Sequence, residues 1–313
     1  TNDTSDMLMF NAEEAGIVVK FEKKDTPQKV NIKLFRQGPK DIRLNDTKIS
    51  QKELIGTLNT VIFCPEDLQL IKGTPSGRRR FLDMEISQTS ATYYHQLMQY
   101  NRLLQQRNAV LKEYRGKQNI PLEEWDLQLA DMASFIVKKR LESLKKINLL
   151  IDLMNRKLTG GLENLTIGYE QPYMENGSLE YTKEGFYERI KAALPQDRHR
   201  LTTSVGPHRD DLRFFSDAMD LKKFGSQGQQ RTAVLSLKLS ELEFIKSEVG
   251  EYPVLLLDDV LSELDESRRA NLLQFIHKRI QTFITTTDIH DFKDLKSVQF
   301  ISCEGGKVQY GQP

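Results

Sequence analysis

The sequence predicts an α/β protein, in which a mixed, parallel-rich sheet with flanking helices and an antiparallel β-subdomain is interrupted by an α-helical second domain. Strand and helix patterns alternate through the C-terminal half, which is typical of a parallel sheet. Residues 79–158 instead repeat apolar side chains at helical spacing. We therefore expect residues 1–80 and 161–313 to form the α/β part and residues 81–160 the helical insertion.

The composition narrows the class of protein. The chain has 313 residues, of which 45 are Lys or Arg and 44 are Asp or Glu, so its formal net charge is only +1. A surface that binds nucleic acid must therefore be a local basic patch. No apolar run is longer than that from Val254 to Leu257, which is far shorter than the roughly 20 residues of a membrane span. Cys64 and Cys303 lie far apart without metal-ligand spacing, which fits reduced thiols in a cytoplasmic protein.

The first half of the chain is expected to pass from strands to helices. Alternating segments at 16–21 and 30–35, punctuated by turn residues, predict β-hairpins, and Thr60 to Phe63 predict a buried strand. Two long antiparallel helices are expected within 79–158, separated by the polar break at 116–119. We expect their basic residues on solvated faces: Arg102, Arg107, Lys138, Lys139, Arg140, Lys145 and Lys146.

The second half is expected to alternate strands and helices. The predicted strands cover 165–169, 253–257, 282–286 and a last segment near 298–302. The predicted helices cover 182–193, which Pro195 ends, 227–247 and 264–280.

The most informative strand ends in two acidic residues. The apolar run Val254 to Leu257 suits a parallel strand buried on both faces, and Asp258 and Asp259 follow it. The carboxyl end of such a strand is where α/β sheets bind ligands. One carboxylate there can hold Mg²⁺ through water, and its neighbour can polarise an attacking water. The alternative is an acidic turn in which Asp259 caps the next helix.

A second segment, Gly225-Ser226-Gln227-Gly228-Gln229, runs directly into the predicted helix at 227–247. Small residues at the head of a helix let its free N–H groups approach an anion. By itself, the segment would more often be a helix cap than a phosphate site. Downstream, Ser262 and Asp265 open the next helix, and Thr287 follows the next strand.

In their order and spacing, these segments resemble the C-terminal half of an ABC-type ATPase of the SMC class. The resemblance assigns a signature loop to Gly225–Gln229, a Walker B motif to Val254–Asp259, a D-loop to Ser262–Asp265 and a switch position to Thr287. Three further segments, 63–68, 77–83 and 206–211, resemble the RecF family of bacterial recombination mediators.

The resemblance implies an ATPase head that binds ATP and Mg²⁺, forms an ATP-dependent homodimer and binds DNA at single-strand gaps. It also implies action with RecO and RecR to place RecA on single-stranded DNA, in recombinational repair, replication and the SOS response. The implied roles are phosphate contact in trans for Ser226, Gly228 and Gln229, Mg²⁺ binding through water for Asp258, water orientation for Asp259, dimer contact for Asp265, and support of the nucleotide for His208, Arg209 and Asp210.

Basic clusters are the candidate DNA contacts. They comprise Arg78, Arg79, Arg80, Lys222 and Lys223. For each cluster, a solvated surface is the competing interpretation, because the 45 basic residues of the chain must lie somewhere.

The sequence departs from the family pattern in three places. It has no Gly-x-x-x-x-Gly-Lys-Ser/Thr motif, so we expect the N-terminal phosphate-binding segment to be missing and this chain alone to be inactive, whereas the full-length protein would be a weak DNA-stimulated ATPase. Asp259 stands where most ABC proteins have Glu, and Thr287 stands where transporters have His, which favours slow turnover. The alternative function is an SMC-like head that binds DNA or partners without productive hydrolysis. A transporter subunit is disfavoured by the helical insertion, and a metal-dependent nuclease by the lack of a third clustered ligand.

Overall fold

A three-stranded parallel sheet joins parts of the chain that are far apart in sequence. The computed structural model describes residues 4–117, 120–161, 163–173, 181–287, 292 and 298–311. Within them, strands β5 (Thr60–Phe63), β9 (Val254–Asp258) and β10 (Thr282–Thr285) pair in the order β10-β9-β5. The predicted strands at 60–63, 253–257 and 282–286 are therefore confirmed, with the acidic strand in the middle.

The two faces of this sheet differ in burial. Leu255 and Leu257 of β9 are buried and belong to the main apolar core, which includes the helix that follows the signature loop. On the opposite face the register aligns Ile62, Leu256 and Phe283 in one row, and Ile62 and Phe283 are 51% and 52% exposed. Among the described residues, only the face that carries Leu255 and Leu257 is fully covered. The strand was predicted to be buried on both faces, and this prediction is correct for that face alone.

Helix α9 (Gln227–Val249) is the core helix of the molecule. Its buried residues occur on every side of the helix, because it packs against α5, α3 and β5. Ser226 caps its first turn, and Gly250, with φ of 91°, ends it in the left-handed conformation that glycine tolerates best. The predicted helix at 227–247 is confirmed.

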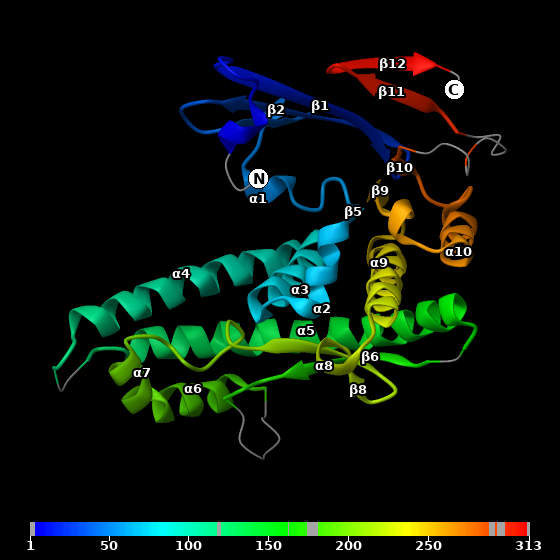
Figure 1. The fold of residues 1–313 in the computed structure, drawn as a ribbon. Coiled ribbons are helices and arrows are strands. Elements are labelled where there is room, and N and C mark those ends of the chain that lie inside the picture. The colour runs from blue at the N-terminus through cyan, green and yellow to red at the C-terminus, as the bar shows by residue number, and fades with distance from the viewer. Residues whose placement is uncertain are drawn as a thin grey trace.

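Three antiparallel sheets flank this centre (Figure 1). The first has four strands, β1 (Glu14–Lys23), β2 (Thr26–Phe35), β3 (Asp41–Leu44) and β4 (Thr47–Lys48). The second has three strands, β6 (Leu165–Glu170), β7 (Asp211–Ser216) and β8 (Met219–Asp220). The third is the hairpin of β11 (Phe300–Glu304) and β12 (Lys307–Gly311). The expected hairpin region near the N-terminus is thus present.

The helical part contains three helices where two were predicted. They are α3 (Pro75–Thr89), α4 (Ala91–Glu113) and α5 (Glu123–Thr159), and α4 and α5 run side by side (Figure 1). Ser90 ends α3 and its hydroxyl caps α4, a break that the apolar spacing does not reveal. Pro195 does follow α6 (Lys183–Ala192), but it lies in the first turn of a further helix, α7 (Leu194–Arg200).

The remaining helices are short or lie near the C-terminus. They are η1 (Thr4–Met7), α1 (Gln51–Leu54), η2 (Pro65–Leu68), α2 (Gln69–Lys72), α8 (Leu221–Phe224), η3 (Leu261–Glu263) and α10 (Glu266–Ile276). No described helix combines the length and apolar character that a membrane crossing requires.

Two arginines that were expected on solvated faces are buried. Arg107 of α4 is 0% exposed, and its guanidinium pairs with Asp126 at 2.6 Å and Asp197 at 2.7 Å. Arg140 of α5 is 2% exposed and pairs with Asp83 at 2.9 Å. The prediction was wrong because local spacing does not show the acidic partners, which come from other elements and make burial of these charges tolerable.

Candidate nucleotide-binding site

Asp258 and Asp259 are held at the carboxyl end of β9 by one threonine from the neighbouring strand. The parallel register places Thr285 beside Asp258. The Thr285 hydroxyl donates to Asp258 Oδ1 at 2.6 Å, and the Asp259 amide donates to Thr285 Oγ1 at 3.1 Å. Both acidic residues are exposed, so two carboxylates project from the end of a rigid strand into solvent. Hard oxygen donors in this arrangement suit a divalent cation such as Mg²⁺.

The turn after β9 is fixed by Asp259 and Ser262. Asp259 has a positive φ of 51°, a conformation that Asp adopts more readily than most residues. The Ser262 hydroxyl lies 2.8 Å from the Asp259 carbonyl oxygen and 3.2 Å from its Oδ1. Asp265, rather than Asp259, caps the next long helix, α10, by accepting from the Arg268 amide at 2.9 Å. This backbone hydrogen bond is the main reason why the pKa of Asp265 is lowered.

The signature loop forms a complete capping box at the start of α9. The Gln229 amide donates to Ser226 Oγ at 3.2 Å, and the Ser226 amide donates to Gln229 Oε1 at 3.0 Å. Gln229 also donates from Nε2 to Glu163 at 3.0 Å. Gly225 is required here, because a Cβ at that position would lie 2.7 Å from the Leu221 carbonyl oxygen. Ser226, Gln227 and Gly228 are exposed, so this helix start remains accessible.

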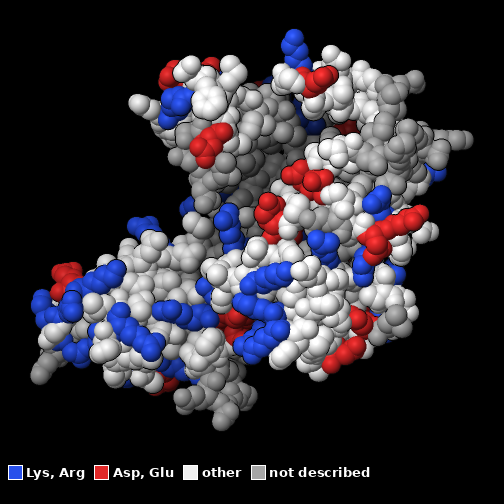
Figure 2. Space-filling model, in the orientation of Figure 1, with Lys and Arg blue, Asp and Glu red and all other residues white. Residues whose placement is uncertain are grey.

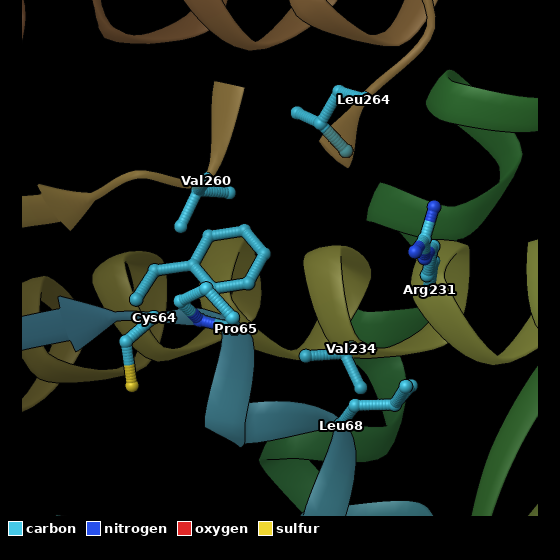
Figure 3. A pocket seen from close by; sticks show the side chains of 8 residues that line it. Cys64, Pro65, Leu68, Arg231, Val234, Val260 and Leu264 are labelled. Carbon is cyan, nitrogen blue, oxygen red and sulfur yellow. The ribbon is translucent and has the colours of Figure 1, made fainter. Parts of the chain in front are cut away.

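A small apolar pocket connects the start of α9 with the turn after β9. It is lined by Phe63, Cys64, Pro65, Leu68, Arg231, Val234, Val260 and Leu264. Figure 3 shows Val260, which follows Asp259, and Leu264 of the D-loop across from Arg231 and Val234 of α9. The segment after the acidic pair and the first two turns of α9 therefore meet at this pocket.

Thr287 lies two residues beyond β10 and is exposed. The residue that bonds to the Asp258 carboxylate and to the Asp259 backbone amide is Thr285, which the sequence analysis did not single out. With the predicted strand bounds, level ends would have placed Thr287 beside Asp258, so only the observed register identifies Thr285.

His208 and Asp210 lie in a buried network. The Tyr100 hydroxyl is 2.6 Å from His208 Nδ1, and Asp210 accepts from Tyr173 at 2.7 Å and also from Tyr169. Burial lowers the pKa of His208 to about 4 and raises the pKa of Asp210. These hydrogen bonds lead to α4, β6 and the loop after β6, and no described contact joins the network to Asp258 or Ser226.

Arg209 donates from NH2 to the Thr203 carbonyl oxygen at 2.7 Å. Its side chain therefore braces its own loop. The role of His208, Arg209 and Asp210 near a nucleotide stays a prediction.

The basic residues proposed as DNA contacts have different environments. Arg78 is 4% exposed and forms a bidentate pair with Asp211 at 2.8 and 2.9 Å, so it is unsuitable for a surface contact. Lys222 donates to the Gly73 carbonyl oxygen at 2.7 Å. Arg80 and Lys223 are exposed, and Arg79 is half-buried. Figure 2 shows that Lys and Arg side chains gather over the helical part of this face.

The described residues contain no cluster of three or more His, Cys, Asp or Glu side chains that could hold a metal by themselves. Mg²⁺ usually needs only one or two carboxylates when phosphate oxygens and water complete its coordination. Asp258 and Asp259 meet that requirement. The described residues offer no site in which protein ligands alone would coordinate the ion.

Comparisons with known proteins identify the family of the chain. No family model matches the chain. The chain is 46% identical over 299 residues to the DNA replication and repair protein RecF of Alkaliphilus oremlandii, covering 95% of this chain and 81% of that protein. It is 44% identical over 309 residues to RecF of a Clostridium botulinum strain, covering 97% of this chain and 84% of the relative.

Solved structures show the same relation. The structure of the recombination mediator protein RecF with ATP, in the RecFOR pathway, matches with a TM-score of 0.90 and 34% identity, covering 99% of this chain and 83% of that chain. An Smc head bound to the C-terminal winged-helix domain of ScpA matches with a TM-score of 0.52 and 13% identity, covering 96% of this chain and 74% of the other. The Smc match supports the fold alone, and the predicted ABC-type ATPase head is confirmed. The chain belongs to the RecF family of DNA replication and repair proteins.

Proposed function

We propose that this protein is an ATP-dependent recombination mediator that dimerises on gapped DNA and acts with RecO and RecR to promote RecA loading. The observation that carries the proposal is the exposed pair Asp258 and Asp259 at the end of β9, whose following segment packs beside the first two turns of the Ser226-capped helix α9. Family membership and the solved structure of RecF with ATP in the RecFOR pathway support ATP as ligand and RecO and RecR as partners.

One copy of the protein would place Asp258, Asp259 and Thr287 beside a bound nucleotide. Mg²⁺ and ATP would contribute the metal charge and the hydrolysable triphosphate. Asp258 would hold the ion through water, and Asp259 would orient a water for attack. Thr287 would donate a hydrogen bond to the γ-phosphate. Thr285 holds the Asp258 carboxylate and the Asp259 backbone amide in place, because its hydroxyl group bonds to both.

A second copy would supply the other set. Ser226 and Gly228 are exposed at the N-terminal end of α9, which carries the positive end of the helix dipole. The Ser226 hydroxyl and the amides of Gly228 and Gln229 would contact the γ-phosphate held by the partner. Because the contact requires that phosphate, hydrolysis would weaken the dimer. Asp265 would face its counterpart at the same interface.

Analytical ultracentrifugation of the full-length protein tests this mechanism. We expect dimers with ATP and monomers with ADP, and Ser226→Arg should abolish the ATP-dependent dimer because a bulky side chain would block the helix start. Ser247→Arg is the matched control, since Ser247 is exposed near the other end of α9. Equal dimerisation with ATP and with ADP would contradict this mechanism.

A second candidate is a head that binds DNA and partners without productive hydrolysis. It is favoured by Asp259, whose short side chain also lies 3.2 Å from the Ser262 hydroxyl. ATPase assays with and without gapped DNA, on the full-length protein and Asp259→Asn, distinguish the two. Turnover equal in both proteins, together with an intact ATP-dependent dimer, would select the second candidate.

A further inference from the structure

A cleft of about 500 Å³ lies between α1, α3 and α4, and neither the acidic pair Asp258 and Asp259 nor the signature loop lines it. Figure 2 shows the surface hollowed between the strand-rich part and the helical part, and Figure 1 shows α1 above α3 and α4 there. We call it the α3–α4 cleft, and its walls include Arg79, Arg80 and Met84 from α3 and Tyr94, Leu97 and Asn101 from α4.

The charge of the cleft favours an anion. Its charged lining side chains are three arginines and one aspartate, Asp83. Asp83 is already occupied, because Arg140 donates to both of its oxygens at 2.9 and 3.0 Å and Tyr93 donates to one of them. Arg79 donates from NH1 to the Asp210 carbonyl oxygen at 2.7 Å, and Arg80 is exposed at the rim. The guanidinium groups of Arg79 and Arg80, which both line the cleft, therefore remain to attract a phosphate, whose oxygens a guanidinium matches in geometry.

The opposite wall is suited to a flat ring. Tyr94 and Leu97 are three residues apart on α4, so they lie on the same side of the helix, and both are half-buried. Met84 of α3 faces the same space and is partly exposed. Aromatic side chains bind unpaired bases by stacking, and Asn101 offers an amide to base edges. The volume is that of a pocket for a small ligand and excludes a duplex.

The floor of the cleft is neutral and fixed. His208 Nε2 lies 3.0 Å from the Thr203 carbonyl oxygen, which can only accept, so Nε2 carries the ring proton. His208 Nδ1 therefore accepts from the Tyr100 hydroxyl at 2.6 Å. Burial lowers the pKa of His208 to about 4, which keeps the ring uncharged near neutral pH. The attraction for an anion is thus concentrated at the arginine rim.

We infer that the α3–α4 cleft binds one unpaired nucleotide, with its phosphate on Arg79 and Arg80 and its base against Tyr94. The inference rests on the proposed function, since it assumes that the protein binds DNA. It places the recognition of gapped DNA at this cleft: DNA with an unpaired extension should bind more tightly than the same duplex with blunt ends, and the difference should depend on Tyr94.

Fluorescence anisotropy on the full-length protein with ATP and labelled DNA tests the inference. The two DNAs are a blunt duplex and the same duplex with a single-stranded extension, at one fixed salt concentration. We expect Tyr94→Ala to weaken binding of the extended DNA about tenfold and to change blunt-duplex binding less than twofold. Arg80→Ala should also weaken binding of the extended DNA about tenfold. Tyr94→Phe should keep most of the preference because it keeps the ring. Arg102→Ala, at an exposed position of α4 outside the cleft, and Tyr310→Ala are the matched controls.

Photo-crosslinking gives a readout that does not depend on variants. With 5-iodouracil at the first unpaired position, we expect the cross-linked peptide to contain Tyr94, and a cross-link confined to other elements would overturn the inference. Variants that weaken both DNAs equally, or neither, would also overturn it while leaving DNA binding intact. Binding of dTMP that Tyr94→Ala abolishes, without any effect on extended DNA, would show a mononucleotide site instead. A wild-type protein that binds neither DNA would refute the proposed function itself.

Discussion

Thr285 fixes the Asp258 carboxylate and the backbone of Asp259. Its hydroxyl donates to Asp258, and its oxygen accepts from the Asp259 amide. We expect Thr285→Val to lower the DNA-stimulated ATPase of the full-length protein about tenfold, because a hydrogen bond to a charged group contributes about 1.5–3 kcal/mol. Thr282→Val is the matched control, since the Thr282 hydroxyl bonds only to the Ile280 carbonyl oxygen at 3.0 Å. If both variants lose activity equally, strand packing rather than carboxylate positioning is responsible.

His208 links the stability of the protein to acid. Burial lowers the pKa of His208 in the folded protein to about 4, below its ordinary value of 6.5. Between these values the unfolded chain binds more protons, so the free energy of unfolding should fall as the pH drops from 6.5 to 4, by at most about 3 kcal/mol.

Urea unfolding of wild type and His208→Gln across this range measures the effect. We expect the stability difference between the two proteins to shrink as the pH falls, because glutamine cannot be protonated. A difference that stays constant from pH 7 to pH 4 would show that His208 titrates normally in the folded protein.

At the scale of elements, Arg107 joins three helices. From α4 it pairs with Asp126 of α5 and Asp197 of α7, and it also donates to Thr203 at 2.9 Å. Removing it would leave two buried carboxylates without a positive partner. We expect Arg107→Met to lower the free energy of unfolding by about 3–5 kcal/mol in urea titrations. Arg102→Met, at an exposed position of the same helix, should change it by less than about 0.5 kcal/mol, and comparable losses in both would contradict this role.

Elements with strong local patterns could be predicted from the sequence, and elements defined by distant partners could not. The strand at Val254 to Leu257 and the helix after Ser226 have apolar patterns of their own, and both were predicted. The boundary at Ser90 was missed because a single capping serine separates two helices of similar composition. The burial of Arg140 was missed because its partner Asp83 lies 57 positions earlier in the chain.

The candidate site shows the same division. Asp258, Asp259 and Ser226 were found from their place next to a strand end or a helix start. Thr285 was missed because its role depends on the register between two strands. Arg78 was taken for a surface residue because its partner, Asp211 of β7, lies 133 positions later in the chain.

At the scale of the whole molecule, one buried cluster of charged residues connects α9 to α3 of the helical part. Lys238 of α9 lies 3.4 Å from Asp67 of η2 and 3.4 Å from Glu241 of its own helix. Glu85 of α3 is buried beside them, and its Oε2 has no hydrogen-bond partner within the described structure. Three carboxylates therefore surround one ammonium group, which cannot balance all of them if all are ionised. Burial raises the pKa of Glu85 to about 7, against the opposing effect of Lys238, and raises the pKa of Glu241 further.

Glu85→Gln should reveal that Glu85 binds a proton more tightly in the folded protein than in the unfolded chain. Because the folded pKa of Glu85 lies above its unfolded value of 4.5, its contribution to stability is complete below pH 4.5 and is lost as the pH rises through 7. We expect the free energy of unfolding of the wild type to fall by up to about 3 kcal/mol relative to that of Glu85→Gln over this interval in urea unfolding.

The effect of Glu85 on the free energy of unfolding changes with pH in the opposite direction to the effect of His208. The two effects partly cancel in the wild type, so each is measured against its own variant. Glu142→Gln, on the exposed side of α5, should leave the pH profile unchanged. Parallel profiles for wild type and Glu85→Gln would mean that Glu85 is ionised in the folded protein, with a stronger positive partner than Lys238 alone.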